Sequence, residues 1–223
     1  MDQHITERVE REVRIRAEDA TLTGNLAVPL GATGVVLFAH GSGSSRHSPR
    51  NRFVAEVLQS AGIGTLLFDL LTRAEEEVDL HTREHRFDIA LLAERLAHAT
   101  LWIGGEDELR DLRIGYFGAS TGSAAALVAA SKLPDRINAV VSRGGRPDLA
   151  DAALPHVRAP TLLIVGGFDD VVIELNRRAY AQLSCEKQLT IVPGASHLFE
   201  EPGTLEEAAG RAAEWFGPHL RSP

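Results

Sequence analysis

Hydrophobic and polar positions follow two different rhythms along this chain. Val9, Val13 and Ile15 alternate with charged residues, which predicts a half-exposed strand near the start of the chain. Residues 21–28 are interpreted as its hairpin partner. After Pro29 the apolar residues become consecutive, as expected of strands that are covered on both faces. Six such runs predict further strands, at residues 35–38, 65–68, 112–117, 137–141, 161–165 and 189–192.

Helical patterns separate these runs. Apolar or small residues that share one helix face occur at 53–61, 89–96, 123–130 and 205–216. Thr204, followed three residues later by Glu207, predicts a capping box at the start of the last helix. The acidic run at 75–77 is interpreted as a solvated loop.

Strands that alternate with helices predict an α/β protein with a mostly parallel central sheet, an N-terminal antiparallel hairpin and helices on both faces. No repeat or long linker divides the chain, so we expect a single domain spanning residues 1–223. The segments between strands are short, and no large lid domain is expected. In such a sheet, ligands bind beyond the carboxyl ends of the strands.

A serine flanked by glycines lies at one of these strand ends. The sequence Gly118-Ala119-Ser120-Thr121-Gly122 follows an apolar run and opens a helix, which matches the G-x-S-x-G nucleophile elbow. Larger side chains at the two glycines would collide with the neighbouring strand and helix. An ordinary glycine and serine turn is the alternative interpretation. The strand-to-helix context favours a nucleophile.

A serine nucleophile needs a base and an acid that orients it. His197 follows the last predicted strand and is the candidate base for Ser120. Asp169 and Asp170 follow the strand before it, which gives the chain order serine, aspartate, histidine. We choose Asp169 as the orienting acid. Asp170 is expected near the start of the next helix, as a cap or a favourable charge for the helix dipole.

The oxyanion of such a reaction needs two backbone donors. The amide of Thr121, directly after the nucleophile, is the first candidate. The second is the amide of Ser42, with Gly43 in reserve, in the glycine-rich loop 40–45. His40 is expected to brace this loop. A flexible connector is the alternative interpretation, and a phosphate-binding loop fits poorly because its lysine pattern is missing.

Several arginines follow the same strand ends. Arg143 and Arg146 are candidate substrate-binding residues that could hold a carboxylate through paired hydrogen bonds. The alternative is structural, with the arginines paired to acids such as Asp69 or Asp148, or facing water. Further arginines follow the glycine-rich loop, at Arg46, Arg50 and Arg52.

Composition excludes several classes of partner and site. The formal charge of 23 − 31 = −8 argues against nucleic acid or an anionic membrane surface. No apolar segment is long enough to span a membrane, and the polar start lacks a secretory signal. Cys185 is the single cysteine, so no internal disulfide is possible and a cytoplasmic location is expected. His81, Glu84 and His85 do not match the H-E-x-x-H zinc pattern, and no metal site is expected.

Together these motifs resemble the α/β-hydrolase superfamily, specifically its dienelactone hydrolase-like family. The resemblance extends over nearly the whole chain, through the loop 40–43, the elbow 118–122, residues 166–169 and the pair 196–197. It implies a catalytic role for Ser120 as nucleophile, His197 as base and Asp169 as acid, with the amides of Ser42 and Thr121 as oxyanion donors and no cofactor.

One departure from the family changes the expected substrate. Dienelactone hydrolases proper use a cysteine nucleophile, whereas this elbow carries serine. We therefore expect hydrolysis of carboxylic esters or lactones of modest size through an acyl-enzyme. The alternatives are a thioesterase, an acyltransferase or a small peptidase on the same scaffold, or a noncatalytic binding module of hydrolase shape.

Overall fold

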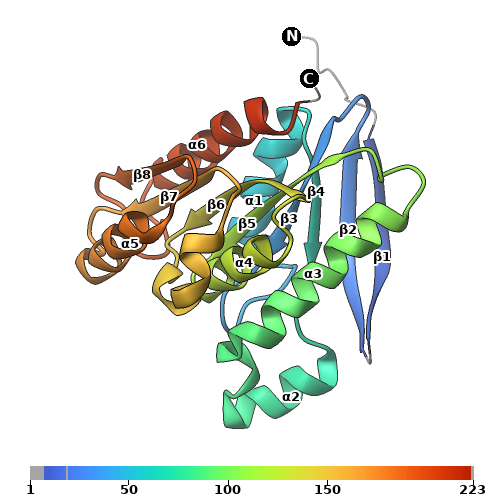
Figure 1. The fold of residues 1–223 in the computed structure, drawn as a ribbon, viewed down its shortest axis with the longest axis horizontal. Helices are drawn as coiled ribbons and strands as arrows, with labels where there is room; N and C mark the ends of the chain where they lie inside the picture. The colour runs from blue at the N-terminus through green and yellow to red at the C-terminus, as the bar shows by residue number, and fades with distance from the viewer. Residues whose placement is uncertain (1–7, 19, 222–223) are drawn as a thin grey trace.

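The computed structural model describes residues 8–18 and 20–221, and within them the predicted fold class is confirmed (Figure 1). One sheet holds eight strands in the order β1-β2-β4-β3-β5-β6-β7-β8. Only the β1–β2 and β2–β4 pairs are antiparallel. The strands are β1 (Arg8–Ala17), β2 (Ala20–Pro29), β3 (Gly34–Ala39), β4 (Gly64–Phe68), β5 (Arg113–Ala119), β6 (Ile137–Arg143), β7 (Thr161–Gly166) and β8 (Lys187–Val192).

Helices cover both faces of this sheet. Helices α1 (Pro49–Ser60) and α6 (Thr204–His219) pack against one face, around Phe38 and Phe216. On the other face, α3 (Ile89–Gly105) and α4 (Thr121–Lys132) pack against each other and enclose Tyr116. The remaining elements are α2 (Arg73–Thr82), α5 (Asp170–Gln182) and the 3₁₀ segments η1 (His85–Phe87) and η2 (Pro147–His156).

The central strands are almost fully buried, which explains their continuous apolar runs. Every residue of β3, β4 and β7 is buried, and so are all but the first residue of β5. In contrast, β1 lies at the edge of the sheet, where Val13, Ile15 and Ala17 are buried and alternate with exposed residues. The predicted alternation does not extend to Val9, because residues 9–12 are all exposed. No helix within 8–18 and 20–221 is long and apolar enough to cross a lipid bilayer.

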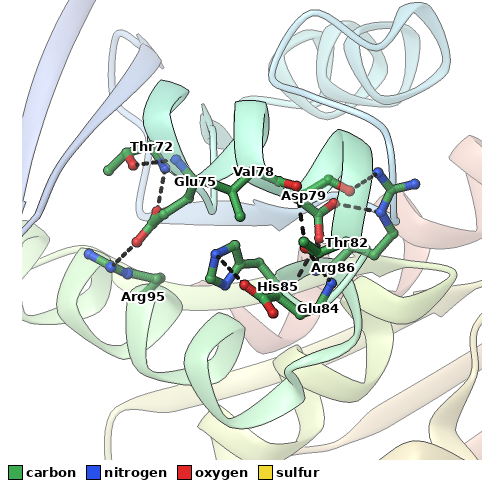
Figure 2. Close-up of polar contacts among 9 residues, drawn as sticks. All are labelled: Thr72, Glu75, Val78, Asp79, Thr82, Glu84, His85, Arg86 and Arg95. Atoms are coloured by element: carbon green, nitrogen blue, oxygen red, sulfur yellow. Dashed lines mark hydrogen bonds and ion pairs between the residues drawn. The ribbon is translucent and has the colours of Figure 1, made fainter.

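The interpretation of the acidic run 75–77 as a loop is wrong, because these residues lie within α2. Thr72 and Glu75 form a capping box: the Thr72 hydroxyl accepts from the Glu75 amide at 3.2 Å, and the Glu75 carboxylate accepts from the Thr72 amide at 2.6 Å. Glu75 also forms an ion pair at 2.8 Å with Arg95, a buried residue of α3 (Figure 2). This contact between distant segments holds the acidic helix against the fold.

The capping box predicted for Thr204 and Glu207 is also wrong. Gly203, with φ 82°, takes the N-cap position of α6. Thr204 is the first residue of the helix, and its hydroxyl donates to the carbonyl of Glu201 at 2.7 Å. The positive φ at Gly203 sets the start of the helix, so Thr204 already has helical geometry.

Candidate active site

Ser120 occupies a strained turn between β5 and α4. Its backbone has φ 52° and ψ −123°, a conformation that non-glycine residues rarely adopt. The serine stands at the N-cap position of α4, yet its side chain makes no capping hydrogen bond. The hydroxyl is therefore free to face the carboxyl ends of the strands rather than the helix.

The two glycines of the elbow are required by close backbone approaches. A Cβ at Gly118 would lie 2.5 Å from the Cα of Ser123 in α4. A Cβ at Gly122 would overlap the carbonyl oxygen of Ala39, at the end of β3. Both collisions are with main-chain atoms, which cannot move aside as a flexible side chain can. The collisions predicted from the sequence, with a helix and with a strand, are both present.

His197 and Asp169 are brought together from the loops after β8 and β7. The Nδ1 of His197 lies 2.6 Å from the Oδ2 of Asp169. The Asp169 side chain is 16% exposed and that of His197 38%. A carboxylate at this distance holds the proton on Nδ1, which leaves Nε2 of the imidazole as the basic nitrogen. Asp170 instead begins α5, where its charge complements the helix dipole.

Ser120 and His197 line the same pocket, which has a volume of about 230 Å³. No hydrogen bond joins their side chains. In apo enzymes such contacts are often long and tighten when substrate binds. The walls come from the loops after four strands and from the start of α1, and include Gly41, Ser42, Ser44, Ser48, Arg50, Asn51, Ala119, Arg143, Gly144 and Leu198.

Ser42 and Thr121, the two predicted oxyanion donors, are bonded to each other. The Ser42 amide donates to Thr121 Oγ1 at 2.9 Å, and the two hydroxyl oxygens are also 2.9 Å apart. The Ser42 hydroxyl donates to the carbonyl of Arg86 at 3.2 Å. Since that donation uses its one proton, the Thr121 hydroxyl must donate to Ser42 Oγ. The loop after β3 is thus tied to the first residue of α4.

His40 braces this loop from the other side. The Leu70 amide donates to Nε2 of His40 at 3.1 Å, so Nε2 carries no proton. The proton is therefore on Nδ1, which donates to the carbonyl of Gly41 at 3.0 Å. Burial lowers the pKa of His40, which favours this neutral form. The ring connects the glycine-rich loop to the chain after β4, in agreement with the expected brace.

An ion pair between the buried Asp79 and the half-buried Arg86, which the sequence interpretation missed, supports the same loop. Asp79 of α2 accepts hydrogen bonds from the amides of His85 and Arg86, each at 2.9 Å, and from Nε of Arg86 at 2.5 Å (Figure 2). Arg86 in turn presents its carbonyl to Ser42. A chain of contacts thus runs from α2 to the elbow. No short motif in the sequence indicates it, because its members lie far apart.

The predicted arginines divide into paired and unpaired residues. Arg146 makes two hydrogen bonds of 2.8 Å to Asp148, and Arg46 forms an ion pair with Asp69. These pairs match the structural alternative, and neither arginine lines the pocket. Arg143 does line it, is buried, and has no acidic partner within the described residues. Among residues 8–18 and 20–221, no three metal-ligating side chains form a cluster.

Comparison with known proteins gives the same fold and close relatives. Residues 34–159 match a family model described as the alpha/beta hydrolase fold. The structure superposes with a TM-score of 0.95 on a crystal structure named dienelactone hydrolase from Anabaena variabilis, with 61% identity over 96% of this chain and 99% of that one. Est1E from Butyrivibrio proteoclasticus, 16% identical over 94% and 98% of the two chains, has a TM-score of 0.78, which shows the fold alone.

A curated relative from Mycobacterium tuberculosis, named "Putative phosphoribosyl transferase", is 57% identical over 214 residues. The match covers 96% of this chain but 47% of the relative. The chain thus spans about half the length of that protein.

Proposed function

Because this chain belongs to the alpha/beta hydrolase family and is dienelactone hydrolase-like, we propose that it is a serine hydrolase of carboxylic esters or lactones of modest size. One observation carries the proposal. Ser120, in the strained conformation of a nucleophile elbow, shares a pocket with an imidazole whose tautomer Asp169 fixes at 2.6 Å. This arrangement supports attack by the hydroxyl with proton transfer to His197.

The proposed reaction has two steps. Ser120 Oγ attacks the ester carbonyl while Nε2 of His197 takes its proton, and Asp169 stabilises the imidazolium that forms. The oxyanion accepts a hydrogen bond from the amide of Thr121 and a second from the amide of Ser42, once that amide has left the Thr121 hydroxyl. Its collapse expels the alcohol, which takes the proton from His197. Water, deprotonated by the same nitrogen, then attacks the acyl-enzyme and releases the acid.

We propose a small-molecule substrate encountered in the cytoplasm. The net charge of −8 disfavours nucleic acid and anionic lipid as partners.

The name of the M. tuberculosis relative describes phosphoribosyl transfer, but this chain covers only 47% of that protein. The residues around Ser120 support acyl transfer instead.

A fluorophosphonate probe tests the nucleophile directly. We expect stoichiometric labelling of Ser120 in the wild-type protein and none in Ser120→Ala. In parallel, turnover of a short-chain ester and lactone panel should fall by about 10³-fold or more in the variant. Folded wild-type protein that neither reacts with the probe nor hydrolyses any ester would favour the noncatalytic binding module.

Product analysis with competing alcohols, thiols and amines separates an esterase from an acyltransferase, thioesterase or peptidase.

A further inference from the structure

The strand β1 is the outermost of the described strands, and one of its two edges is open. The neighbour on one side is β2, and no strand within 8–18 and 20–221 pairs with the other side (Figure 1). An edge strand presents unpaired N–H and C=O groups to which a further strand can bind. With 10 residues, β1 is long for a strand and offers an extended edge for such pairing.

The even-numbered residues of β1 direct their backbone groups toward this open edge. Along an antiparallel pair, residues that exchange both hydrogen bonds with the neighbouring strand alternate with residues that exchange none. Thr23 of β2 lies opposite Arg14, but its carbonyl accepts at 3.0 Å from the amide of Asp69, directly after β4. Arg14 therefore exchanges no hydrogen bond with β2. By the alternation, the residues whose N–H and C=O face outward include Glu10, Glu12, Arg14 and Arg16.

The side chains of these four residues carry charges in a definite order. They lie on the exposed face of β1, with the acids Glu10 and Glu12 before the bases Arg14 and Arg16. Glu12 contacts Arg46 at 3.5 Å, but the Glu12 side chain is 63% exposed, and such surface pairs are weak. A second copy of β1 in antiparallel orientation can therefore set its bases against these acids.

One antiparallel register between two copies pairs every one of these charges with its opposite. In it, Val13 of one copy faces Val13 of the other across a two-fold axis. Glu12 of each copy then lies opposite Arg14 of the other, and Glu10 lies opposite Arg16. Because outward-facing residues must pair with one another, the next possible registers differ by two residues. Those registers bring either Glu12 or Arg14 opposite the same residue of the second copy.

We propose that the outer edge of β1 binds a second copy of this chain, in the antiparallel register centred on Val13. The interface then gains up to about eight backbone hydrogen bonds and cross-strand pairs of opposite charge. Charges on an edge strand usually prevent pairing, but here their order makes the strand complementary to itself. None of the residues that line the catalytic pocket belongs to β1, so the dimer does not depend on the proposed hydrolase activity.

Sedimentation equilibrium of the wild-type chain tests whether the dimer exists. We expect a reversible equilibrium between monomer and dimer, with a dissociation constant that rises with salt because the interface is charged. A chain that stays monomeric up to about 500 µM would overturn the proposal, and the charges would then serve to keep the edge unpaired. Assemblies larger than the dimer would also overturn it, because two-fold pairing of one edge closes the assembly.

Charge reversal tests the register. In Glu12→Arg, and separately in Arg14→Glu, residues 12 and 14 have the same sign, and we expect the dissociation constant to rise by about tenfold or more. The double variant Glu12→Arg/Arg14→Glu restores opposite signs and should dimerise within about threefold of the wild type. An equimolar mixture of the two single variants should form a heterodimer, because one supplies two bases and the other two acids.

Matched controls make the same charge changes on another exposed surface. Glu174 and Arg178 form an exposed ion pair in α5, and Glu174→Arg and Arg178→Glu should leave the dissociation constant unchanged. Far-UV circular dichroism checks that each variant is folded. If Glu12→Arg lost its fold together with the contact to Arg46, Arg14→Glu would still test the interface. A dimer that resists both reversals at residues 12 and 14, or a mixture that does not associate, would overturn the proposed register.

Discussion

The backbone amide of Ser42 donates its hydrogen bond to the side chain of Thr121, across 2.9 Å. The two residues expected to stabilise the oxyanion are therefore joined before any substrate is present. The Thr121 hydroxyl both accepts from the Ser42 amide and donates to the Ser42 hydroxyl. It fixes the loop after β3 against the start of α4, where a displacement of the donors by one ångström would reduce catalysis substantially.

Removal of the Thr121 hydroxyl tests whether it positions the Ser42 loop or competes with the substrate for the Ser42 amide. We expect Thr121→Val to lower kcat by about tenfold or more, because the Ser42 loop loses its attachment to the elbow. Thr121→Ser keeps the hydroxyl and should keep most of the turnover. The measurement is steady-state hydrolysis of a neutral ester by the three proteins. A Thr121→Val enzyme that is as fast as the wild type, or faster, would mean that the hydroxyl competes with the substrate carbonyl for the Ser42 amide.

The positions of the catalytic candidates could be predicted because they depend on local patterns. Continuous apolar runs identify buried parallel strands, and the residue after each run lies at the carboxyl edge of the sheet. Ser120, Asp169 and His197 each follow such a run. The elbow also constrains its own glycines, since both face main-chain atoms of neighbouring elements. Sequence alone therefore brings Asp169 and His197 to one edge, although it does not give their distance.

Asp169 and Asp170 offer an internal comparison of the orienting acid. Asp169→Asn removes the carboxylate that holds His197 and should lower kcat by about 10³-fold to 10⁴-fold, because the tautomer and the imidazolium lose their support. Asp170→Asn removes a favourable helix charge of about 0.3–1 kcal/mol and should leave kcat within a few-fold. Turnover of one ester and chemical unfolding of both variants supply the data. If the two kcat effects were reversed, the assignment of Asp169 would be wrong.

The elbow glycines can be tested through stability. We expect Gly122→Ala to lower the free energy of unfolding by about 2 kcal/mol or more, since its Cβ would overlap the main chain of β3. Gly210→Ala in α6 is the control, because a Cβ there meets nothing within 4 Å. In the helix that change should stabilise the protein by up to about 1 kcal/mol. Urea unfolding measures both, and equal effects would contradict the close-approach argument.

Contacts between distant segments explain what the sequence could not show. A local capping-box pattern, Thr72 followed three residues later by Glu75, does mark the start of α2, whereas the contact of Glu75 with Arg95 in α3 has no sequence signal. Asp79 and Arg86 are only seven residues apart, but their pairing depends on the turn between α2 and η1, which has no short motif. The two candidate arginines differ likewise: Arg146 finds Asp148 two residues away, whereas Arg143 ends a buried strand without an acid. Polarity alone does not distinguish these two outcomes.

His40 should make the stability of the fold depend on pH. Burial lowers its pKa in the folded state, whereas in the unfolded chain it has the ordinary value of about 6.5. As the pH falls below about 6.5, the unfolded chain binds a proton that the folded state refuses, so this group reduces stability by up to about 1.4 kcal/mol per pH unit. Above pH 7 both states are neutral, and the contribution is constant.

A variant that does not titrate isolates this effect from that of other groups. Urea unfolding between pH 5 and 8 is compared for the wild type and His40→Gln. We expect the variant to be less stable at pH 8, because the hydrogen bonds of His40 to Leu70 and Gly41 are lost or weakened. The difference in unfolding free energy between the two proteins should shrink as the pH falls from about 6.5. Protonation of His40 stabilises the unfolded chain of the wild type, whereas the variant has no group there to protonate. Parallel curves would mean that the buried imidazole takes up its proton as readily in the fold as in the unfolded chain.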